Sequence, residues 1–167
     1  PDVVRDPDSE RWWMAYTGVD TLMNQRIGMA WSSDLDTWHK LPENPVVTPD
    51  PARFAYDPAG GWADCRDPFL YRDDTGWHLL TTVRVDHDVP WQGAVGRTSS
   101  TDLVQWNPLD VWLVNDSGDP TNILESTGYI ARGRTHHLIF HEQDIHGIRH
   151  MSTADPASWT FTNAAWI

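Results

Sequence analysis

The hydrophobic and polar positions of this chain follow one pattern three times. Each copy has an apolar run, an aromatic-rich run, a run of small residues ending in Ser or Thr, and then an Asp followed four residues later by Trp. Self-similarity of this kind predicts a repeat architecture in which each unit stacks on its neighbours. The Asp/Trp pairs are Asp34/Trp38, Asp102/Trp106 and Asp155/Trp159, and the aromatic-rich runs span residues 11–16, 76–81 and 135–140.

Each copy is predicted to form a four-stranded β-sheet. Its apolar runs are short, rich in β-branched and aromatic residues, and bounded by Gly, Pro, Asp and Asn, which is typical of strands and turns. No stretch has helical periodicity. A four-stranded repeat is one blade of a β-propeller, a fold that has roughly 4–8 blades. We therefore predict an all-β propeller domain over residues 1–167, with blades at about 1–50, 64–114 and 122–167.

Three blades cannot close a ring, so we expect the chain to be part of a larger propeller. It begins at Pro1 in an apolar run and stops at Trp166-Ile167, where a strand would still be pairing. If the chain were complete, two copies could close a six-bladed ring by self-association. No signal peptide or transmembrane segment is visible, which leaves a secreted and a cytoplasmic location both open.

The charge of the chain disfavours two classes of partner. Its net charge is −12, and Lys40 is the only lysine among 12 basic residues. The resulting field repels phosphate backbones and anionic lipid, so we expect neither nucleic acid nor membrane as a partner. The single cysteine, Cys65, excludes an internal disulfide framework and is predicted to be a buried strand residue.

The 11 tryptophans fall into two groups. Most, including Trp13 and Trp106, occupy repeated positions and are expected to pack between blades. Trp62 and Trp91 break the repeat and lie in long turn-rich segments. A planar apolar face beside polar groups suits stacking on a sugar ring, so ligand contact and simple packing both remain open for these two residues.

Two carboxylates are candidates for catalysis. The first strand of each propeller blade lines the central channel, so equivalent first-strand positions converge on one site. Aligning the copies places Glu125 near the position of Asp67, and the first-copy equivalent of Asp67 immediately before Pro1. Carboxylates that share a cavity can divide the roles of proton donor and ionised partner, as glycoside hydrolysis requires. The alternative is structural: Asp67 would cap a strand or pair with Arg66, and Glu125 would be a solvated turn residue.

The residues at these positions resemble a known group. The segment from Arg66-Asp67-Pro68 to Phe69 is similar to the Arg-Asp-Pro motif of the propeller glycoside hydrolases of families 43 and 32, the arabinofuranosidase/xylosidase and invertase/levanase relatives. The turns from Ser32 to Trp38 and from Ser99 to Trp106 are similar to their Ser-x-Asp-Leu-x-x-Trp blade turns. The resemblance implies a five-bladed fold with three channel acids, of which two blades would lie outside this chain.

The resemblance also implies roles for individual residues. Asp67 would be the auxiliary carboxylate that holds sugar hydroxyls and tunes the acid, and Glu125 would be the general acid. The nucleophile or base would stand just before Pro1, whereas Asp2 is left out of the catalytic set because strand alternation points it to the other side. One departure concerns Glu125, which is followed by Ser126-Thr127 rather than by the Gly-Pro or Cys-Pro common in these families.

Other polar residues could assist. Arg66 is expected to orient Asp67 by a charge-assisted hydrogen bond, and Arg84 to meet substrate at a strand end. His141 is expected to hydrogen-bond sugar. No metal site is predicted, although the resemblance allows a structural calcium, because no carboxylate-rich loop is present. Alternation puts His137 and His141 on one strand face, within a cluster of five histidines: His136, His137, His141, His146 and His150.

The sequence therefore predicts a glycoside hydrolase that cleaves furanosides or pentose-containing oligosaccharides with channel carboxylates. Two alternatives remain. A non-catalytic carbohydrate-binding propeller would keep the scaffold and bind sugar without cutting it. A glycoside phosphorylase would need basic residues in the cavity for phosphate, and the scarcity of lysine argues against it.

Overall fold

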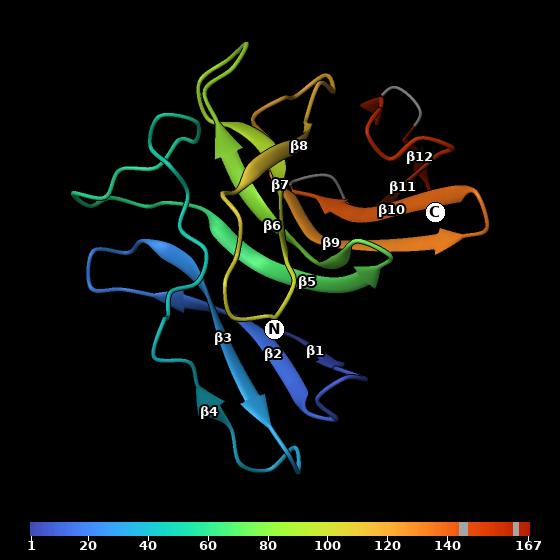
Figure 1. Ribbon diagram of the computed structural model, residues 1–167. Helices are drawn as coiled ribbons and strands as arrows, with labels where there is room; N and C mark the ends of the chain where they lie inside the picture. The colour runs from blue at the N-terminus through green and yellow to red at the C-terminus, as the bar shows by residue number, and fades with distance from the viewer. Residues whose placement is uncertain (144–146, 162–163) are drawn as a thin grey trace.

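The computed structural model describes residues 1–143, 147–161 and 164–167, and its strands form three antiparallel sheets of four strands each (Figure 1). The first sheet contains β1 (Asp2–Arg5), β2 (Trp12–Val19), β3 (Gln25–Ser32) and β4 (His39–Lys40). The second contains β5 (Cys65–Asp73), β6 (Gly76–Val85), β7 (Gln92–Ser100) and β8 (Asp110–Val114). The third contains β9 (Leu124–Arg132), β10 (Thr135–Glu142), β11 (Ile148–Thr153) and β12 (Ala165–Trp166).

Each sheet follows its chain order from one edge strand to the other, as a propeller blade does. The first strands lie next to one another, because β5 contacts both β1 and β9. The described part of the chain is without α-helix, so the predicted all-β propeller fold is confirmed. It accordingly holds no helix long and apolar enough to cross a membrane.

Two hydrophobic cores lie between the three sheets. The first core packs the first sheet on the second and includes Trp13, Met29 and Leu79, and the second core packs the second sheet on the third and includes Leu80 and Phe140. Because successive strand residues point to opposite faces, Leu79 and Leu80 of β6 serve different cores. The middle sheet is therefore covered on both faces, which explains the nearly continuous burial of β6.

The first two of the three repeated Asp/Trp segments form equivalent turns. In the first sheet Ser32 Oγ accepts the Leu35 amide at 2.9 Å, and Asp34 Oδ1 accepts the Thr37 amide at 2.8 Å. The backbone donors, led by the amide of Thr37, lower the pKa of Asp34. In the second sheet Ser100 and Asp102 make the same bonds to Leu103 and Gln105. The motif thus encodes a turn in which Leu35 and Leu103 take positive φ.

The strand register fixes which first-strand residues are equivalent. Asp2 pairs with Ala15, Phe69 with Leu80, and Gly128 with Ile139, so Asp2, Phe69 and Gly128 occupy corresponding places in β1, β5 and β9. Counting back one residue makes Pro1 equivalent to Pro68. The expected placement of the Asp67 equivalent just before Pro1 agrees with this register.

The same register corrects the placement of Glu125. A bulge in β5 sets Asp67 and Pro68 between the paired residues Arg66 and Phe69. An equivalent irregularity in the pairing of β9 with β10 sets Ser126 and Thr127 between Glu125 and Gly128. Ser126 is therefore the equivalent of Asp67, and Glu125 is the equivalent of Arg66, one residue earlier than the sequence alignment implied.

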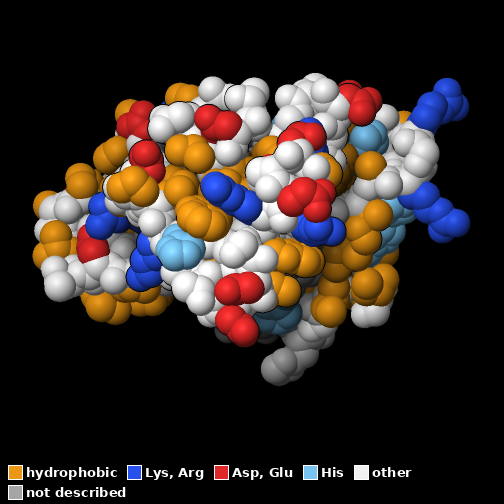
Figure 2. Space-filling view, turned by 60° about the horizontal axis from the view of Figure 1, so that its bottom comes forward, with side chains coloured by type: hydrophobic (Ala, Val, Ile, Leu, Met, Phe, Trp, Pro, Cys, Tyr) orange, Lys and Arg blue, Asp and Glu red, His pale blue; other side chains and the backbone are white. Residues whose placement is uncertain are grey.

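The surface is mixed in charge. Figure 2 shows Lys and Arg side chains scattered among acidic and hydrophobic ones over the face that it presents, rather than gathered in one basic patch. Cys65 is fully buried in β5 as predicted, and this burial raises the pKa of its thiol to about 12. A thiol that is buried and held in its neutral form is unreactive, so Cys65 is a packing residue.

Candidate active site

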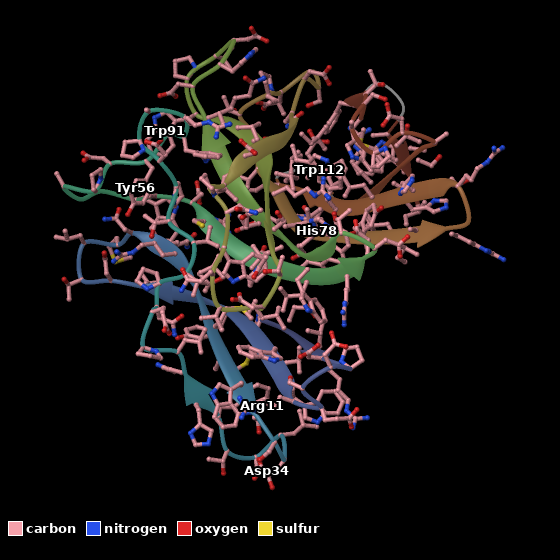
Figure 3. All side chains as sticks on the ribbon, viewed as in Figure 1. Arg11, Asp34, Tyr56, His78, Trp91 and Trp112 are labelled. Carbon is pink, nitrogen blue, oxygen red and sulfur yellow. The ribbon has the colours of Figure 1, made fainter. Side chains whose placement is uncertain are left out.

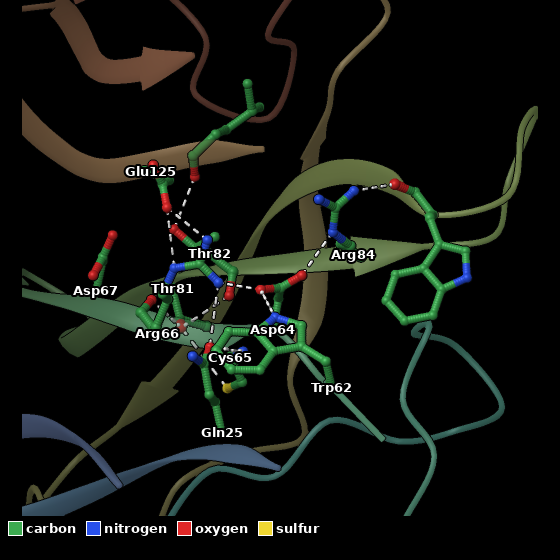
Figure 4. A network of polar contacts seen from close by, with 12 residues as sticks. Gln25, Trp62, Asp64, Cys65, Arg66, Asp67, Thr81, Thr82, Arg84 and Glu125 are labelled. Carbon is green, nitrogen blue, oxygen red and sulfur yellow. Dashed lines mark hydrogen bonds and ion pairs between the residues drawn. The ribbon is translucent and has the colours of Figure 1, made fainter. Parts of the chain in front are cut away.

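Asp67 and Glu125 lie on adjacent first strands, β5 and β9 (Figure 4). The Oδ2 atom of Asp67 accepts hydrogen bonds from the amide of Ser126 at 3.0 Å and from its hydroxyl at 3.4 Å. Asp67 is thus tied to the residue that follows Glu125. The structure brings the two predicted acids to one place on two neighbouring blades.

The backbone at this place is strained in both strands. Asp67 has a φ of 53° and Ser126 a φ of 52°, which is the left-handed region that favours glycine. Strain of this kind costs about 1–3 kcal/mol and clusters at functional sites. A strained residue opens each bulge, and a cavity of about 200 Å³ lies beside them, lined by Pro1, Asp2, Asp67, Pro68, Phe69, Ser126 and Thr127.

Asp2 contributes to the same cavity without sharing the chemistry of Asp67. Its Oδ2 atom accepts the amide of Leu70 at 2.7 Å, so it links β1 to β5. This contact is a structural role for Asp2. It is consistent with leaving Asp2 out of the catalytic set.

Arg66 binds Glu125 and not Asp67, which makes the expected pairing wrong. Its Nη2 and Nε atoms donate to Oε1 of Glu125 at 2.6 and 3.2 Å, and its Nη1 atom forms an ion pair with Asp64. Asp67 instead accepts from Ser126 of β9, and Figure 4 shows it away from the Asp64 side of Arg66. Burial opposes the charge of Arg66, but the bonds to Glu125 and Asp64 raise its pKa.

Glu125 is therefore bound by Arg66 through one of its two oxygens only. Arg66 occupies Oε1, whereas Oε2 lies 3.6 Å from Nδ1 of His141. The side chain of Glu125 is 24% exposed. A partly exposed carboxyl group that is oriented through one oxygen can pass a proton to a bound molecule through the other. It is a strand residue rather than the solvated turn residue of the structural alternative.

Asp64 was missed by sequence reasoning. Its side chain is only 1% exposed, and its Oδ2 atom accepts from Nε of Arg84 at 2.6 Å while Oδ1 accepts from Nε1 of Trp62 at 2.9 Å. Figure 4 shows it between Arg66 and Arg84. The one available signal was its position two residues before Arg66, which puts both side chains on the same face of an extended strand.

The two unusual tryptophans line one groove. Trp62 is 50% exposed and Trp91 46% exposed, and both border a cavity of about 370 Å³ together with Phe54 and Tyr56. Figure 3 shows Tyr56 and Trp91 on neighbouring loops at the same edge of the molecule. We call this cavity the aromatic groove. Its exposed indole faces suit a sugar ring.

Arg84 supports this groove instead of standing free in it. Its Nη1 atom donates to the carbonyl oxygens of Trp91 at 2.5 Å and Thr121 at 2.8 Å, and its guanidinium lies 5.8 Å from the centre of the Trp91 ring. The side chain is 14% exposed. Arg84 therefore holds the loop that carries Trp91, and direct contact with substrate stays a prediction.

The other described histidines of the cluster, His136, His137 and His150, are paired with one another or with tyrosine. His137 Nδ1 lies 2.9 Å from His150 Nε2, and His136 Nδ1 lies 2.5 Å from the Tyr129 hydroxyl. His146 lies outside the described residues. Within residues 1–143, 147–161 and 164–167, no group of three or more His, Cys, Asp or Glu side chains could hold a metal ion. A structural calcium remains an untested prediction.

Three adjoining four-stranded sheets whose first strands lie side by side define the fold as that of a β-propeller. Comparisons with known proteins support that class. No family model matches the chain. A levanase from Bacillus sp. (strain L7) is 37% identical over 90 residues, which cover 52% of this chain and 9% of the levanase.

Solved structures show the same fold. A family 32 β-fructofuranosidase from Bombyx mori matches with a TM-score of 0.69 and 19% identity over 98% of this chain and 34% of its own. A fructan 1-exohydrolase IIa from Cichorium intybus matches with a TM-score of 0.69 and 20% identity over 90% of this chain and 29% of its own. A thermostable family 43 glycoside hydrolase matches with a TM-score of 0.66 and 12% identity over 99% of this chain and 52% of its own.

These matches confirm the resemblance to propeller relatives of families 32 and 43. The chain spans about a third of the length of the first two solved structures, 34% and 29%, and 9% of the levanase.

Proposed function

We propose that the chain carries part of the active site of a glycoside hydrolase that cleaves furanosides or pentose-containing oligosaccharides. The observation that carries this proposal is the meeting of Asp67 and Glu125 at matching bulges of adjacent first strands. The likeness to a levanase adds support. A mutant of the Bombyx mori enzyme was solved in complex with sucrose, which favours fructofuranosides among the candidate substrates.

In this mechanism Glu125 donates a proton to the leaving oxygen. Arg66 orients the Glu125 carboxyl through Oε1 and leaves Oε2 to act on the substrate. Asp67 binds sugar hydroxyls and stabilises the positive charge that develops on the sugar ring. The position before Pro1, equivalent to Asp67 by strand register, would supply the nucleophile or base.

The remaining side chains contact the rest of the substrate. His141 lies beside the free oxygen of Glu125 and is placed to hydrogen-bond a sugar hydroxyl. The aromatic groove accommodates a second sugar ring, stacked on Trp62 or Trp91. Arg84 contributes through the loop of Trp91.

The test is an assay of the full-length gene product on aryl arabinofuranosides, aryl xylosides, sucrose and levan. We expect turnover of at least one furanoside, and its loss in Asp67→Asn and Glu125→Gln. If the parent turns over none of these substrates, or if both variants match an active parent, the proposal is wrong.

A carbohydrate-binding propeller without catalysis is the second candidate. The bonds from Arg66 to Glu125 favour it, because a carboxyl oxygen that already accepts two hydrogen bonds from an arginine suits fixed orientation in a binding site. Sugar binding without hydrolysis would support this candidate. Binding is measured by a change in tryptophan fluorescence that depends on Trp62 and Trp91. A phosphorylase is less well supported, because both Arg66 and Arg84 are already paired with Asp64.

A further inference from the structure

Asp64 is the hub of a buried polar network that has no assigned role. It receives Arg66, Arg84 and the indole N–H of Trp62 on its two oxygens. Its own side chain is 1% exposed, and it borders neither the cavity beside Asp67 nor the aromatic groove. It cannot itself touch a bound sugar. Any effect of Asp64 on substrate must pass through the residues that it holds.

The charges of this network balance. Two guanidinium groups, Arg66 and Arg84, face two carboxylates, Asp64 and Glu125. A buried charge that loses its partner costs about 3–5 kcal/mol. Without the carboxylate of Asp64, Arg84 would lose its ion-pair partner, and the guanidinium of Arg66 would no longer be held by a carboxylate on each side.

The network also joins two places on the molecule. On one side Arg66 binds both Asp64 and Glu125 and so connects them. On the other side Trp62 lines the aromatic groove, and Arg84 holds the backbone of Trp91, which lines the same groove. Figure 4 shows the continuous line of bonds between these two ends.

We propose that Asp64 is a positioning residue that sets the proton donor and the aromatic groove in one fixed relation. It holds Arg66 against Glu125, and it holds the indole of Trp62 at the wall of the groove. A sugar chain would then have its scissile bond at Glu125 when its next ring lies on Trp62. This inference rests on the proposed function.

The test separates the two contacts of Asp64 by kinetics in the full-length gene product. Asp64→Asn removes the charge but keeps an oxygen that accepts from Trp62. A misplacement of about 1 Å can cost roughly 100-fold in rate. We therefore expect kcat per folded molecule to fall about 100-fold while KM changes less than about threefold. Asp64→Ala also loses the contact to Trp62, and its KM should rise by about tenfold.

Two further variants distinguish positioning from stability. Asp64→Asn with Arg84→Gln restores the charge balance, so it should recover thermal stability but not kcat. Glu142→Gln is the matched control, because Glu142 is fully buried and pairs with Arg149 and Ser117, outside the Asp64 network. It should lose stability and keep kcat. The folded fraction is measured by near-ultraviolet circular dichroism at the assay temperature.

The inference is overturned if Asp64→Asn keeps kcat within about threefold of the parent, or if the charge-balanced double variant recovers kcat together with stability. Should Asp64→Asn not fold, the double variant decides the question. Failure of the proposed function looks different. In that case Asp67→Asn and Glu125→Gln also keep the activity of the parent, or the parent has none.

Discussion

The bulges of β5 and β9 have the same backbone and opposite chemistry. Each opens with a residue in the left-handed region, Asp67 in β5 and Ser126 in β9, and each is preceded by a charged residue, Arg66 and Glu125. The two pairs then bind one another: Arg66 donates to Glu125, and Ser126 donates to Asp67. The repeat supplies the scaffold, and complementary side chains at equivalent positions make this place the candidate site.

In this arrangement Asp67 and Glu125 are positioned by strands and not by loops. The strands are held together near the bulges by Thr82, whose hydroxyl donates to the carbonyl of Leu124 at 2.8 Å, and by Asp2, which accepts the amide of Leu70 at 2.7 Å. Side chains that start from paired strands are confined more closely than side chains on loops. The geometry of Asp67 and Glu125 is therefore a property of blade packing.

The largest effect is expected when the chemistry of the β9 bulge is removed. Glu125→Gln keeps the shape of the side chain and can still accept from Arg66, but it cannot donate a proton as an acid. General acid catalysis contributes about 100- to 10,000-fold, so kcat on an unactivated glycoside should fall by that factor. Steady-state kinetics on sucrose or levan measure it.

The leaving group gives the sharper form of this experiment. An aryl glycoside whose leaving phenol is acidic needs little protonation. The fall in kcat that Glu125→Gln causes on this substrate should therefore be at least tenfold smaller than the fall on an unactivated glycoside. Glu142→Gln makes the same chemical change in β10 and should leave both rates in place. Equal losses on activated and unactivated substrates would remove Glu125 from the role of proton donor.

The fold was predictable from the sequence because its signals are local. Strand patterns and the turns at Asp34 and Asp102 depend on residues within a few positions of one another. The position just before Pro1 also followed from the repeat, because Pro1 and Pro68 share a register. Each of these inferences needs only the order of residues within a blade or the alignment of one blade with another.

The partners of the charged residues were not predictable in the same way. Arg66 reaches Glu125 in the next blade, and Asp64 reaches Arg84 near the end of β6, the strand that pairs with β5. Neither pair is adjacent in sequence, whereas the expected partner Asp67 is. A carboxylate is the signal that sequence reading follows, so the third-blade equivalent of Asp67 was sought at Glu125 and not at the uncharged Ser126.

A smaller effect is expected when the contact between the two bulges is weakened at Arg66. Arg66→Lys keeps the positive charge but replaces the two-point contact with Glu125 by a single ammonium group. We expect kcat to fall about 10- to 100-fold, which corresponds to ~1.4–2.7 kcal/mol. The equivalent change at Arg149, which pairs with Glu142, is the control and should leave kcat unaltered. A parent-like kcat in Arg66→Lys would mean that orientation of Glu125 does not depend on Arg66.

The smallest effect concerns the strained backbone that the bulges share. A left-handed conformation destabilises the folded state by about 1–2 kcal/mol for a non-glycine residue. Replacing that residue with glycine removes this strain but favours the unfolded state by about 0.5–1 kcal/mol, because glycine has more backbone freedom there. Ser126→Gly should therefore stabilise the chain by about 0.5–1 kcal/mol and raise Tm by about 1–4 °C. Ser152→Gly, in the regular strand β11 opposite His137, lacks the strain and should lower Tm instead. Thermal unfolding of the two variants beside the parent measures the difference, and a lower Tm for both would mean that the β9 bulge stores no strain at Ser126.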